Sequence, residues 1–230
     1  MQLPNLKIPK LIHSTSSEYN KLIEVYQVGD IRRLSVDGVV QSISHTAKSV
    51  ERRFWGQVEG FVAENRPEAR HILMFGLGGG TMLHLFAEDM PDAHITVIEI
   101  DSEMIRVAEE YFDLKNLTNV SILNEDVMRV MTDPTKYDLH ISTFDVVVVD
   151  IFCGLKYPDL GSSGTFFAGI ERLLRPEGLV VFNRIYIDDV KHEVDDFCES
   201  VEEQFINVGT KTVAGRTNSD NLLVYGEVEK

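Results

Sequence analysis

The hydrophobic residues near the N-terminus alternate with polar ones in short runs. Residues 22–26 and 32–35 are such runs, and the turn dipeptide Gly29-Asp30 separates them. A second turn dipeptide, Asp37-Gly38, lies between β-branched residues. This pattern predicts a small antiparallel β unit over residues 1–49.

After this unit, apolar runs alternate with segments whose apolar residues recur at helical spacing. The runs predict strands at residues 71–75, 95–100, 120–123, 144–149, 179–183, 208–213 and 222–226. The segments predict helices at residues 50–63, 81–89, 102–112, 165–174 and 188–205, and a short helix after Asp126. Strands that alternate with helices need crossover connections, so residues 50–230 are expected to form one α/β domain with a doubly wound, mostly parallel, Rossmann-like sheet.

The composition limits the partners and the location that we expect. The 230 residues include 37 acids and 22 bases, which give a formal net charge of −15. Nucleic acids and anionic membranes are bound by an excess of Lys and Arg, so neither is expected as a partner. The longest apolar run, around residues 146–149, is too short to span a bilayer, and prolines interrupt any signal-peptide pattern. Because Cys153 and Cys198 are too few for a disulfide framework, we expect a cytoplasmic protein.

A glycine-rich loop follows the strand expected at residues 71–75. It reads Gly76-Leu77-Gly78-Gly79-Gly80 and leads directly into a helix, where a backbone turns sharply and a nucleoside approaches closely. Glu99 ends the next strand about 20 residues on, where an acid accepts the ribose hydroxyls. The alternative is a tight turn followed by a surface acid. Thr81 stands at the third glycine position of GxGxxG, which favours an adenosine ligand without a pyrophosphate.

Two more acids follow strands and are expected to face the same cleft, because ligands bind at the carboxyl ends of the strands. Asp126 is placed to accept the exocyclic amine of adenine, to cap the helix that begins at Val127, or to do both. Asp150 follows four valines and is placed to orient or deprotonate a nucleophile, with a turn cap as the alternative. No metal is expected, since the histidines and cysteines lack ligand spacing.

These residues together resemble the spermidine synthase family, a branch of the class I S-adenosylmethionine-dependent transferase fold. Residues 17–20 (SEYN) and 36–41 (VDGVVQ) are similar to the SxYQ and LDGxxQ stretches of the family's N-terminal β domain. Residues 98–101 (IEID) resemble its EID segment, and residues 124–126 (NED) its GDG or GDA segment. Asp150 resembles the first acid of its DSxDP loop, and the resemblance covers nearly the whole chain.

The resemblance implies that Gln41 and Glu99 hold the sugar and sulfonium side of S-adenosylmethionine or its decarboxylated form, and that Asp126 holds the adenine. It implies that Asp150 serves an amine acceptor and that the chain forms a homodimer through the β unit. The candidate ligand-binding residues are thus Gln41, Gly76, Gly78, Glu99, Asp126 and Val127, and the candidate catalytic residue is Asp150.

The amine side of the family's pocket is altered in this chain. The family's GGGDGG becomes residues 76–80 without an acid, and its YHEM or YQEM segment becomes residues 55–58 (WGQV). The second acid and the proline of DSxDP are absent from residues 150–154, and residues 214–218 replace the IPTYPSG segment. A cationic amine chain needs several carboxylates and aromatic rings to leave water. The glycine loop is closer to spermidine-synthase-like proteins, including methyltransferase domains of that shape.

Three functions remain open from the sequence. Aminopropyl transfer uses decarboxylated S-adenosylmethionine, whereas methyl transfer uses the intact donor, whose carboxylate faces the glycine loop. The missing acid in that loop removes a repulsion against this carboxylate and favours tolerance of the intact donor. The third function is a noncatalytic nucleoside-binding scaffold whose acidic helix, within residues 188–203, binds a basic partner. Residues 151–165, rich in glycine and serine, are a candidate lid.

Overall fold

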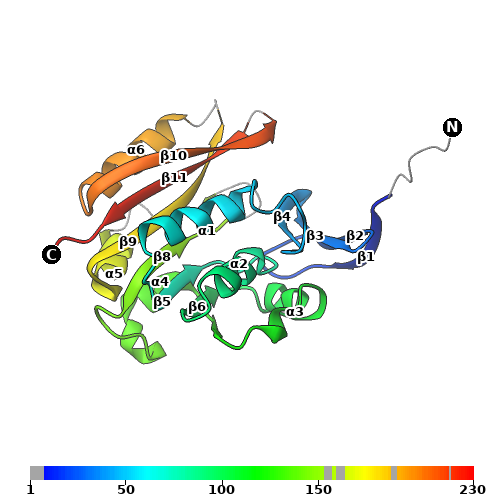
Figure 1. Ribbon diagram of the computed structural model, residues 1–230, viewed down its shortest axis with the longest axis horizontal. Helices are drawn as coiled ribbons and strands as arrows, with labels where there is room; N and C mark the ends of the chain where they lie inside the picture. Colours follow the sequence, from blue (N-terminus) through cyan, green and yellow to red (C-terminus); the bar gives the residue numbers. More distant parts are fainter. Residues whose placement is uncertain (1–7, 153–156, 159–163, 188–190, 218) are drawn as a thin grey trace.

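The computed structural model describes residues 8–152, 157–158, 164–187, 191–217 and 219–230. This part of the chain contains a small antiparallel sheet near the N-terminus and a large sheet covered by helices (Figure 1). The arrangement confirms the α/β fold with an N-terminal β unit. None of the helices described is long and apolar enough to cross a membrane. Most of the candidate lid at residues 151–165, including Cys153, lies outside the described residues.

The small sheet has four antiparallel strands in the order β1-β2-β3-β4. Both expected turns are present, Gly29-Asp30 between β2 and β3 and Asp37-Gly38 between β3 and β4. The sequence pattern did not predict β1, in which no residue is buried. The boundary predicted between residues 49 and 50 falls after this sheet and stays a prediction. The strands are β1 (Lys10–Thr15), β2 (Ile23–Val28), β3 (Ile31–Val36) and β4 (Val39–Ile43).

The large sheet has the order β10-β11-β9-β8-β5-β6-β7. Its strands β5 to β9 pair in parallel, and β10 and β11 add an antiparallel edge. The direction of winding reverses at β5, between β6 and β8, and ligands bind at such a switch point. The strands are β5 (His71–Phe75), β6 (His94–Glu99), β7 (Val120–Asn124), β8 (Phe144–Val149), β9 (Leu174–Ile187), β10 (Ile206–Thr217) and β11 (Ser219–Glu227).

Helices cover both faces of the large sheet, with α1, α2 and α3 on one face and α4, α5 and α6 on the other. They are α1 (Phe54–Asn65), α2 (Thr81–Asp89), α3 (Ser102–Tyr111), α4 (Val127–Thr132), α5 (Gly164–Leu173) and α6 (Lys191–Glu202). Two short 3₁₀ turns lie at Leu114–Asn116 and Pro134–Tyr137. The helix predicted at residues 188–205 is α6, and residues 188–190 lie outside the described part.

Several elements differ from their predicted bounds, β10, β11 and α6 among them, and two of the differences have a clear physical reason. The strand predicted at residues 179–183 is the longer β9, because β11 pairs with it as far as Ile187. Helix α1 begins at Phe54 rather than at Val50, since a hydrogen bond from Val50 N to Ala47 O closes a turn before the helix. Val50 is nevertheless buried, so packing in the core explains its apolar spacing.

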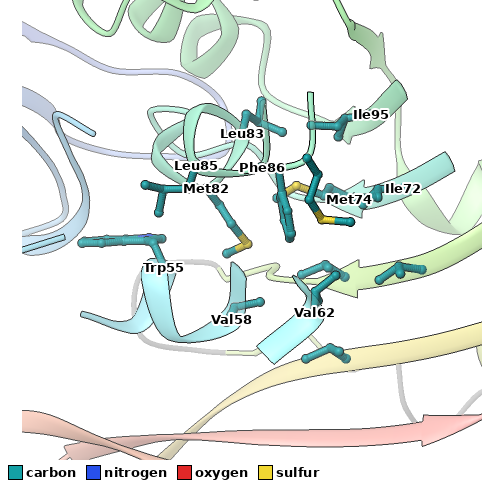
Figure 2. Close-up of a cluster of buried hydrophobic side chains, with 14 of the residues drawn as sticks. Trp55, Val58, Val62, Ile72, Met74, Met82, Leu83, Leu85, Phe86 and Ile95 are labelled. Carbon is teal, nitrogen blue, oxygen red and sulfur yellow. The ribbon is translucent and has the colours of Figure 1, made fainter. Parts of the chain in front are cut away.

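Alternate residues of the central strands pack into two separate cores, as the pleat of a strand requires. On one face, Met74 of β5 joins Trp55 of α1 and Phe86 of α2 in the cluster of Figure 2. On the other face, Phe75 packs against Phe166 of α5, with 6.0 Å between ring centroids. Trp55 is therefore a packing residue.

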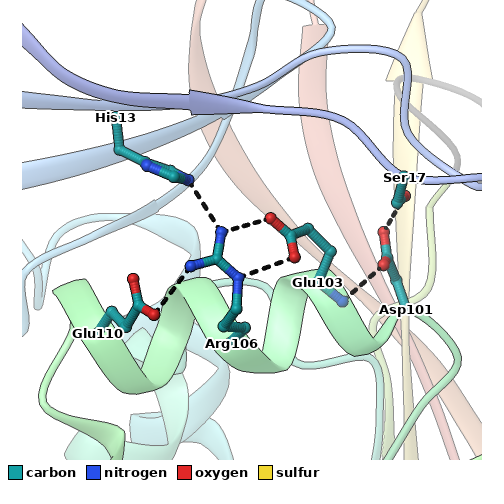
Figure 3. Close-up of polar contacts among 6 residues, drawn as sticks. All are labelled: His13, Ser17, Asp101, Glu103, Arg106 and Glu110. Atoms are coloured by element: carbon teal, nitrogen blue, oxygen red, sulfur yellow. Dashed lines mark hydrogen bonds and ion pairs between the residues drawn. The ribbon is translucent and has the colours of Figure 1, made fainter.

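Helix α3 packs against the small sheet. Arg106 Nη2 lies 2.6 Å from Glu103 Oε1, and Arg106 Nη1 lies 2.8 Å from Glu110 Oε1. The same guanidinium contacts His13 of β1, with 3.3 Å between Nη2 and Nε2 (Figure 3). Apolar residues of β2 and β3 pack against Val107 of this helix. Because α3 directly follows β6, these contacts hold the small sheet beside the carboxyl end of the large one.

Candidate active site

A cavity of about 300 Å³ lies at the carboxyl ends of β5, β6, β7 and β8, beside the small sheet. Its walls come from the residues that follow these strands, from Val36 of β3 and Gln41 of β4, and from α3 and residues 19–20. The structure brings every candidate residue of the sequence analysis into this wall. They are Gln41, Gly76, Gly78, Glu99, Asp126, Val127 and Asp150.

The glycine loop approaches its neighbours so closely that two positions exclude a side chain. Gly76 has a φ of +91°, and an ideal Cβ there would lie 2.2 Å from the carbonyl oxygen of Asp150. Gly78 has a φ of +55°, and a Cβ there would lie 2.9 Å from Ser42 Oγ. Both conformations are costly for residues with a side chain. The loop therefore presents bare backbone to the cavity.

Strand β4 is hydrogen-bonded to the same loop. Gly79 N donates to Ser42 Oγ at 2.7 Å, and Thr81 Oγ1 donates to Ile43 O at 2.6 Å. Thr81, which replaces the third glycine of the dinucleotide pattern, thus fastens the small sheet to α2. These bonds hold Gln41, the neighbour of Ser42, in the wall of the cavity. Sequence reasoning missed Ser42, because a serine between two strand residues carries no distinctive pattern.

Glu99 is buried at the end of β6, with 8% of its surface exposed. Its Oε2 accepts a hydrogen bond from Leu77 N at 2.9 Å, and its Oε1 accepts one from Asp101 N at 2.9 Å. Burial raises the pKa of Glu99, and these backbone bonds oppose the rise because they stabilise the charged form. A carboxylate has about four acceptor positions, so capacity remains for a ligand's hydroxyl groups.

The SEYN segment is anchored over the cavity by Asp101. Ser17 Oγ and Asn20 Nδ2 each donate to Asp101 Oδ2 at 2.6 Å. The other oxygen of Asp101 accepts a bond from Glu103 N at 2.9 Å and caps α3. Tyr19, held between the two anchored residues, lines the mouth of the cavity. The segment that resembles SxYQ thus closes one side of the candidate site.

Asp126 caps α4, where its Oδ1 accepts a hydrogen bond from Met128 N at 2.8 Å. This observation confirms the capping role that the sequence offered as one possibility. Asp126 and Val127 also line the cavity, so the capping role leaves the ligand role open. Both residues stand at the end of β7, on the side where Glu99 ends β6.

Asp150 is half-buried at the end of β8, and its backbone N–H donates to Phe75 O at 2.9 Å. Its Oδ1 accepts a hydrogen bond from Asn183 Nδ2 at 2.7 Å. Burial raises the pKa of Asp150 to about 6, and the bond from Asn183 opposes the rise. A carboxylate with this pKa is ionised at neutral pH and suits general-base chemistry. Sequence reasoning missed Asn183, which no spacing links to Asp150.

The segments that depart from the spermidine synthase pattern add no acid to the cavity wall that the structure describes. Trp55 is in the core, and Gln57 Nε2 donates to Glu51 O at 2.9 Å. The side chains of residues 214–217, and residues 153 and 154, lie outside the described part. The acids in the described wall are therefore Glu99, Asp126 and Asp150.

A model of the methyltransferase domain family matches residues 68–225, which is more than half of the chain. The chain belongs to this family. The methyltransferase domain of this chain has the class I fold of spermidine-synthase-like proteins. A probable spermidine synthase from Corynebacterium glutamicum superimposes with a TM-score of 0.77 and 23% identity, over 96% of this chain and 80% of that one.

Two relatives of this methyltransferase domain are transferases with different reactions. The polyamine aminopropyltransferase of Vibrio vulnificus is 26% identical over 205 residues, 86% of this chain and 67% of that protein. The eEF1A lysine and N-terminal methyltransferase homolog of Drosophila melanogaster is 30% identical over 127 residues, 54% of this chain. This match spans only 19% of the fly protein's length.

Proposed function

We propose that this methyltransferase domain transfers an alkyl group from a sulfonium nucleoside to an amine. The donor is S-adenosylmethionine or its decarboxylated form, and the group is methyl or aminopropyl. The observation that carries the proposal is the shared cavity of Glu99 and Asp150, which end β6 and β8 on either side of β5. The acid that we propose for the nucleoside and the base that we propose for the acceptor thus lie at one switch point.

The residues present fit the donor. Bare backbone at Gly76 and Gly78 allows a close approach, and Glu99 has acceptor capacity for the ribose hydroxyls. Asp126 would accept the adenine amine, and apolar atoms of Val127 would contact the ring. Gln41, on β4, would hold the sulfonium side together with the small sheet.

The reaction needs no further reactant. The lone pair of the acceptor nitrogen forms a bond to a carbon attached to the sulfonium sulfur. The bond from that carbon to sulfur breaks, and its electron pair stays on sulfur to leave a neutral thioether. Asp150 accepts the proton that the nitrogen loses. Since the sulfonium carbon is already electrophilic, alignment and proton removal are the main demands on the protein.

Methyl transfer is the form of the reaction that the glycine loop favours. No acid occurs in residues 76–80, and a Cβ at Gly79 would lie 2.9 Å from Ser42 Cβ. The carboxylate of the intact donor therefore meets no negative charge on this loop. The fly relative's name also supports a primary amine of a protein as the acceptor. The similarity to the polyamine aminopropyltransferase of Vibrio vulnificus supports aminopropyl transfer instead.

Calorimetric titration with S-adenosylmethionine, and separately with its decarboxylated form, tests the proposal. Tighter binding of the intact donor would support methyl transfer, and tighter binding of the decarboxylated donor would support aminopropyl transfer. Mass spectrometry of the nucleoside product then identifies the group that leaves, with putrescine and a lysine peptide as two acceptors. Failure to bind either donor would contradict the proposal and support a noncatalytic scaffold.

A further inference from the structure

Two asparagines form a hydrogen-bonded chain behind Asp150. Asn183 Nδ2 donates to Asp150 Oδ1 at 2.7 Å, and Asn183 Oδ1 accepts from Asn221 Nδ2 at 2.9 Å. Val149 of β8 pairs with Phe182 of β9, so Asn183 lies beside Asp150 at the next position. The chain therefore runs across the large sheet from the cavity through β9 to β11.

The direction of these bonds is fixed by chemistry. An ionised carboxylate only accepts hydrogen bonds, so Asn183 must present its NH₂ group to Asp150. Its carbonyl oxygen then faces Asn221, which must donate. A flipped Asn183 would place oxygen against oxygen at Asp150 and nitrogen against nitrogen at Asn221. Asn221 thus supports the orientation in which Asn183 stabilises the charged carboxylate, because it donates to the amide oxygen of Asn183.

The position of Asn183 is unusual for an amide. Its exposed fraction is 4%, and the three residues before it on β9, Val180, Val181 and Phe182, are buried apolar residues. Burying an amide costs free energy unless it is hydrogen-bonded, and an apolar residue would serve packing equally well. The buried amide of Asn183 is hydrogen-bonded to the candidate base Asp150, so an effect on the charge or orientation of Asp150 explains it better than packing does.

We propose that Asn183 is a positioning residue for Asp150, and that Asn221 orients Asn183 for this task. The inference rests on the proposed function, in which Asp150 accepts the proton of the amine. A neutral amide can hold one carboxylate oxygen and favour its charged form without adding a cation that would repel a protonated amine. Asp150 thereby keeps both its orientation and its negative charge for the acceptor.

Other ionisable groups around Asp150 lie on separate elements. Glu99 on β6 and Asp126 before α4 line the same cavity, and Tyr157 follows β8. Arg184, the next residue on β9, stacks over the ring of Tyr157 at 3.9 Å. Its side chain leaves the strand on the face opposite to Asn183. Within this set, Asn183 makes the direct hydrogen bond to Asp150.

Three variants of the full chain test the proposal through the pKa of Asp150 and the pH profile of turnover. Asn183→Leu removes the bond and keeps the branched shape of the side chain. Asn221→Asp can only accept, so it competes with Asp150 for the amide hydrogens of Asn183 and adds a negative charge beside them. Asn183→Leu and Asn221→Asp should each move the acid limb of the pH profile to a pH about one unit higher. Donor affinity should not change. Asn221→Leu should shift the acid limb less, and the exposed Asn116→Asp should leave it in place.

Carbon NMR of the aspartate carboxyl groups measures the same pKa without any acceptor, so the test stands even if the acceptor is unknown. Circular dichroism shows whether each variant is folded. If Asn183→Leu does not fold, Asn221→Leu replaces it as the test of the hydrogen-bonded chain. An acid limb and a carboxyl pKa that both stay in place in Asn183→Leu and Asn221→Asp would overturn the positioning role. Full turnover in Asp150→Asn would instead overturn the proposed function, a separate outcome.

Discussion

Glu99 links the shape of the glycine loop to the candidate ligand, because one carboxylate binds Leu77 N and Asp101 N and also lines the cavity. We expect Glu99→Gln to weaken donor binding about 10-fold or more, since hydrogen bonds to a charged group contribute about 1.5–3 kcal/mol. Calorimetric titration measures the loss. Glu64→Gln, at an exposed position on α1, should bind as the unmodified chain does. An unchanged affinity in Glu99→Gln would remove Glu99 from the site.

Asp150 is predicted to act on the acceptor rather than on the donor. Asp150→Asn should lower kcat by about 10² to 10⁴, the usual contribution of a general base, and should leave the donor Kd within about twofold. Turnover assays and titration of the same preparation give the two values. Equal losses in turnover and in donor binding would place Asp150 in the donor site instead.

The pH dependence follows from the same residue. The base must be deprotonated, and the pKa of Asp150 lies at about 6 because burial raises it. With the unmodified chain, kcat/KM should fall about tenfold for each pH unit below pH 6. Above pH 6, the ionisation of Asp150 should no longer change kcat/KM. A profile without an acid limb near this pH would mean that another group takes the proton.

At the scale of elements, the turn between β5 and α2 sets how closely the glycine loop lies to β8. Gly76→Ala should cost about 2–4 kcal/mol of stability, because a methyl group there meets the Asp150 carbonyl at a positive φ. Gly60→Ala on α1 is the matched control, because no atom beyond its chain neighbours and the nearby helix backbone lies within 4 Å of its Cβ position. That variant should gain about 0.5–1 kcal/mol. Urea unfolding measures both, and equal effects would contradict the tight approach.

The contact between α1 and α2 contains a buried acid, Glu59, whose Oε1 has no hydrogen-bond partner in the described structure. Burial first, and Asp89 second, raise the pKa of Glu59 to about 7 from 4.5. The folded chain thus binds this proton more tightly than the unfolded one. The resulting stability is present below pH 4.5 and is lost as the pH rises through about 7.

Glu59→Gln should therefore flatten the dependence of stability on pH. At pH 8 the variant should exceed the unmodified chain by about 2–3 kcal/mol, and at pH 5 the two should be similar. Urea unfolding at both pH values gives the difference. Glu64→Gln on the same helix should not change the pH dependence. A constant difference at both pH values would show that packing, rather than the proton, explains the effect.

The sequence predicted those elements whose apolar residues are buried in a regular period. Strand β8, with six buried residues, belongs to this group, whereas the turns of the small sheet were predicted from their Gly and Asp residues. Strand β1 was missed because it is an edge strand with no buried residue, so burial leaves no periodic signal in it. The predicted helix at residue 50 began too early, since a buried Val50 in a turn has the same spacing as one in a helix.

The residues of the candidate site also include some that the sequence could predict and some that it could not. Acids that end strands, such as Glu99 and Asp150, could be located because the carboxyl ends of parallel strands meet at one edge. Asn183 and Asn221 could not, because their meeting depends on the register of β8, β9 and β11. Register joins residues far apart in sequence, and only the folded chain reveals it.

Across the whole molecule, charge acts at two ranges. The net charge of −15 makes distant acids repel one another. Ion pairs such as Arg106 with Glu103 and Glu110 join atoms less than 3 Å apart. The Debye length falls from about 30 Å at 0.01 M salt to about 8 Å at 0.15 M. Salt therefore screens the distant repulsion strongly and the close pairs weakly.

Raising NaCl from 10 to 150 mM should consequently stabilise the folded chain, by about 1 kcal/mol, because repulsion is relieved more than attraction is lost. Urea unfolding at pH 7.5 in both salts measures the change. Arg106→Met removes the close pairs on α3 and should cost about the same, 1 kcal/mol or less, at both salt concentrations. Should salt instead lower stability, and should Arg106→Met abolish that loss, the contact between α3 and β1 would outweigh the repulsion of the whole molecule.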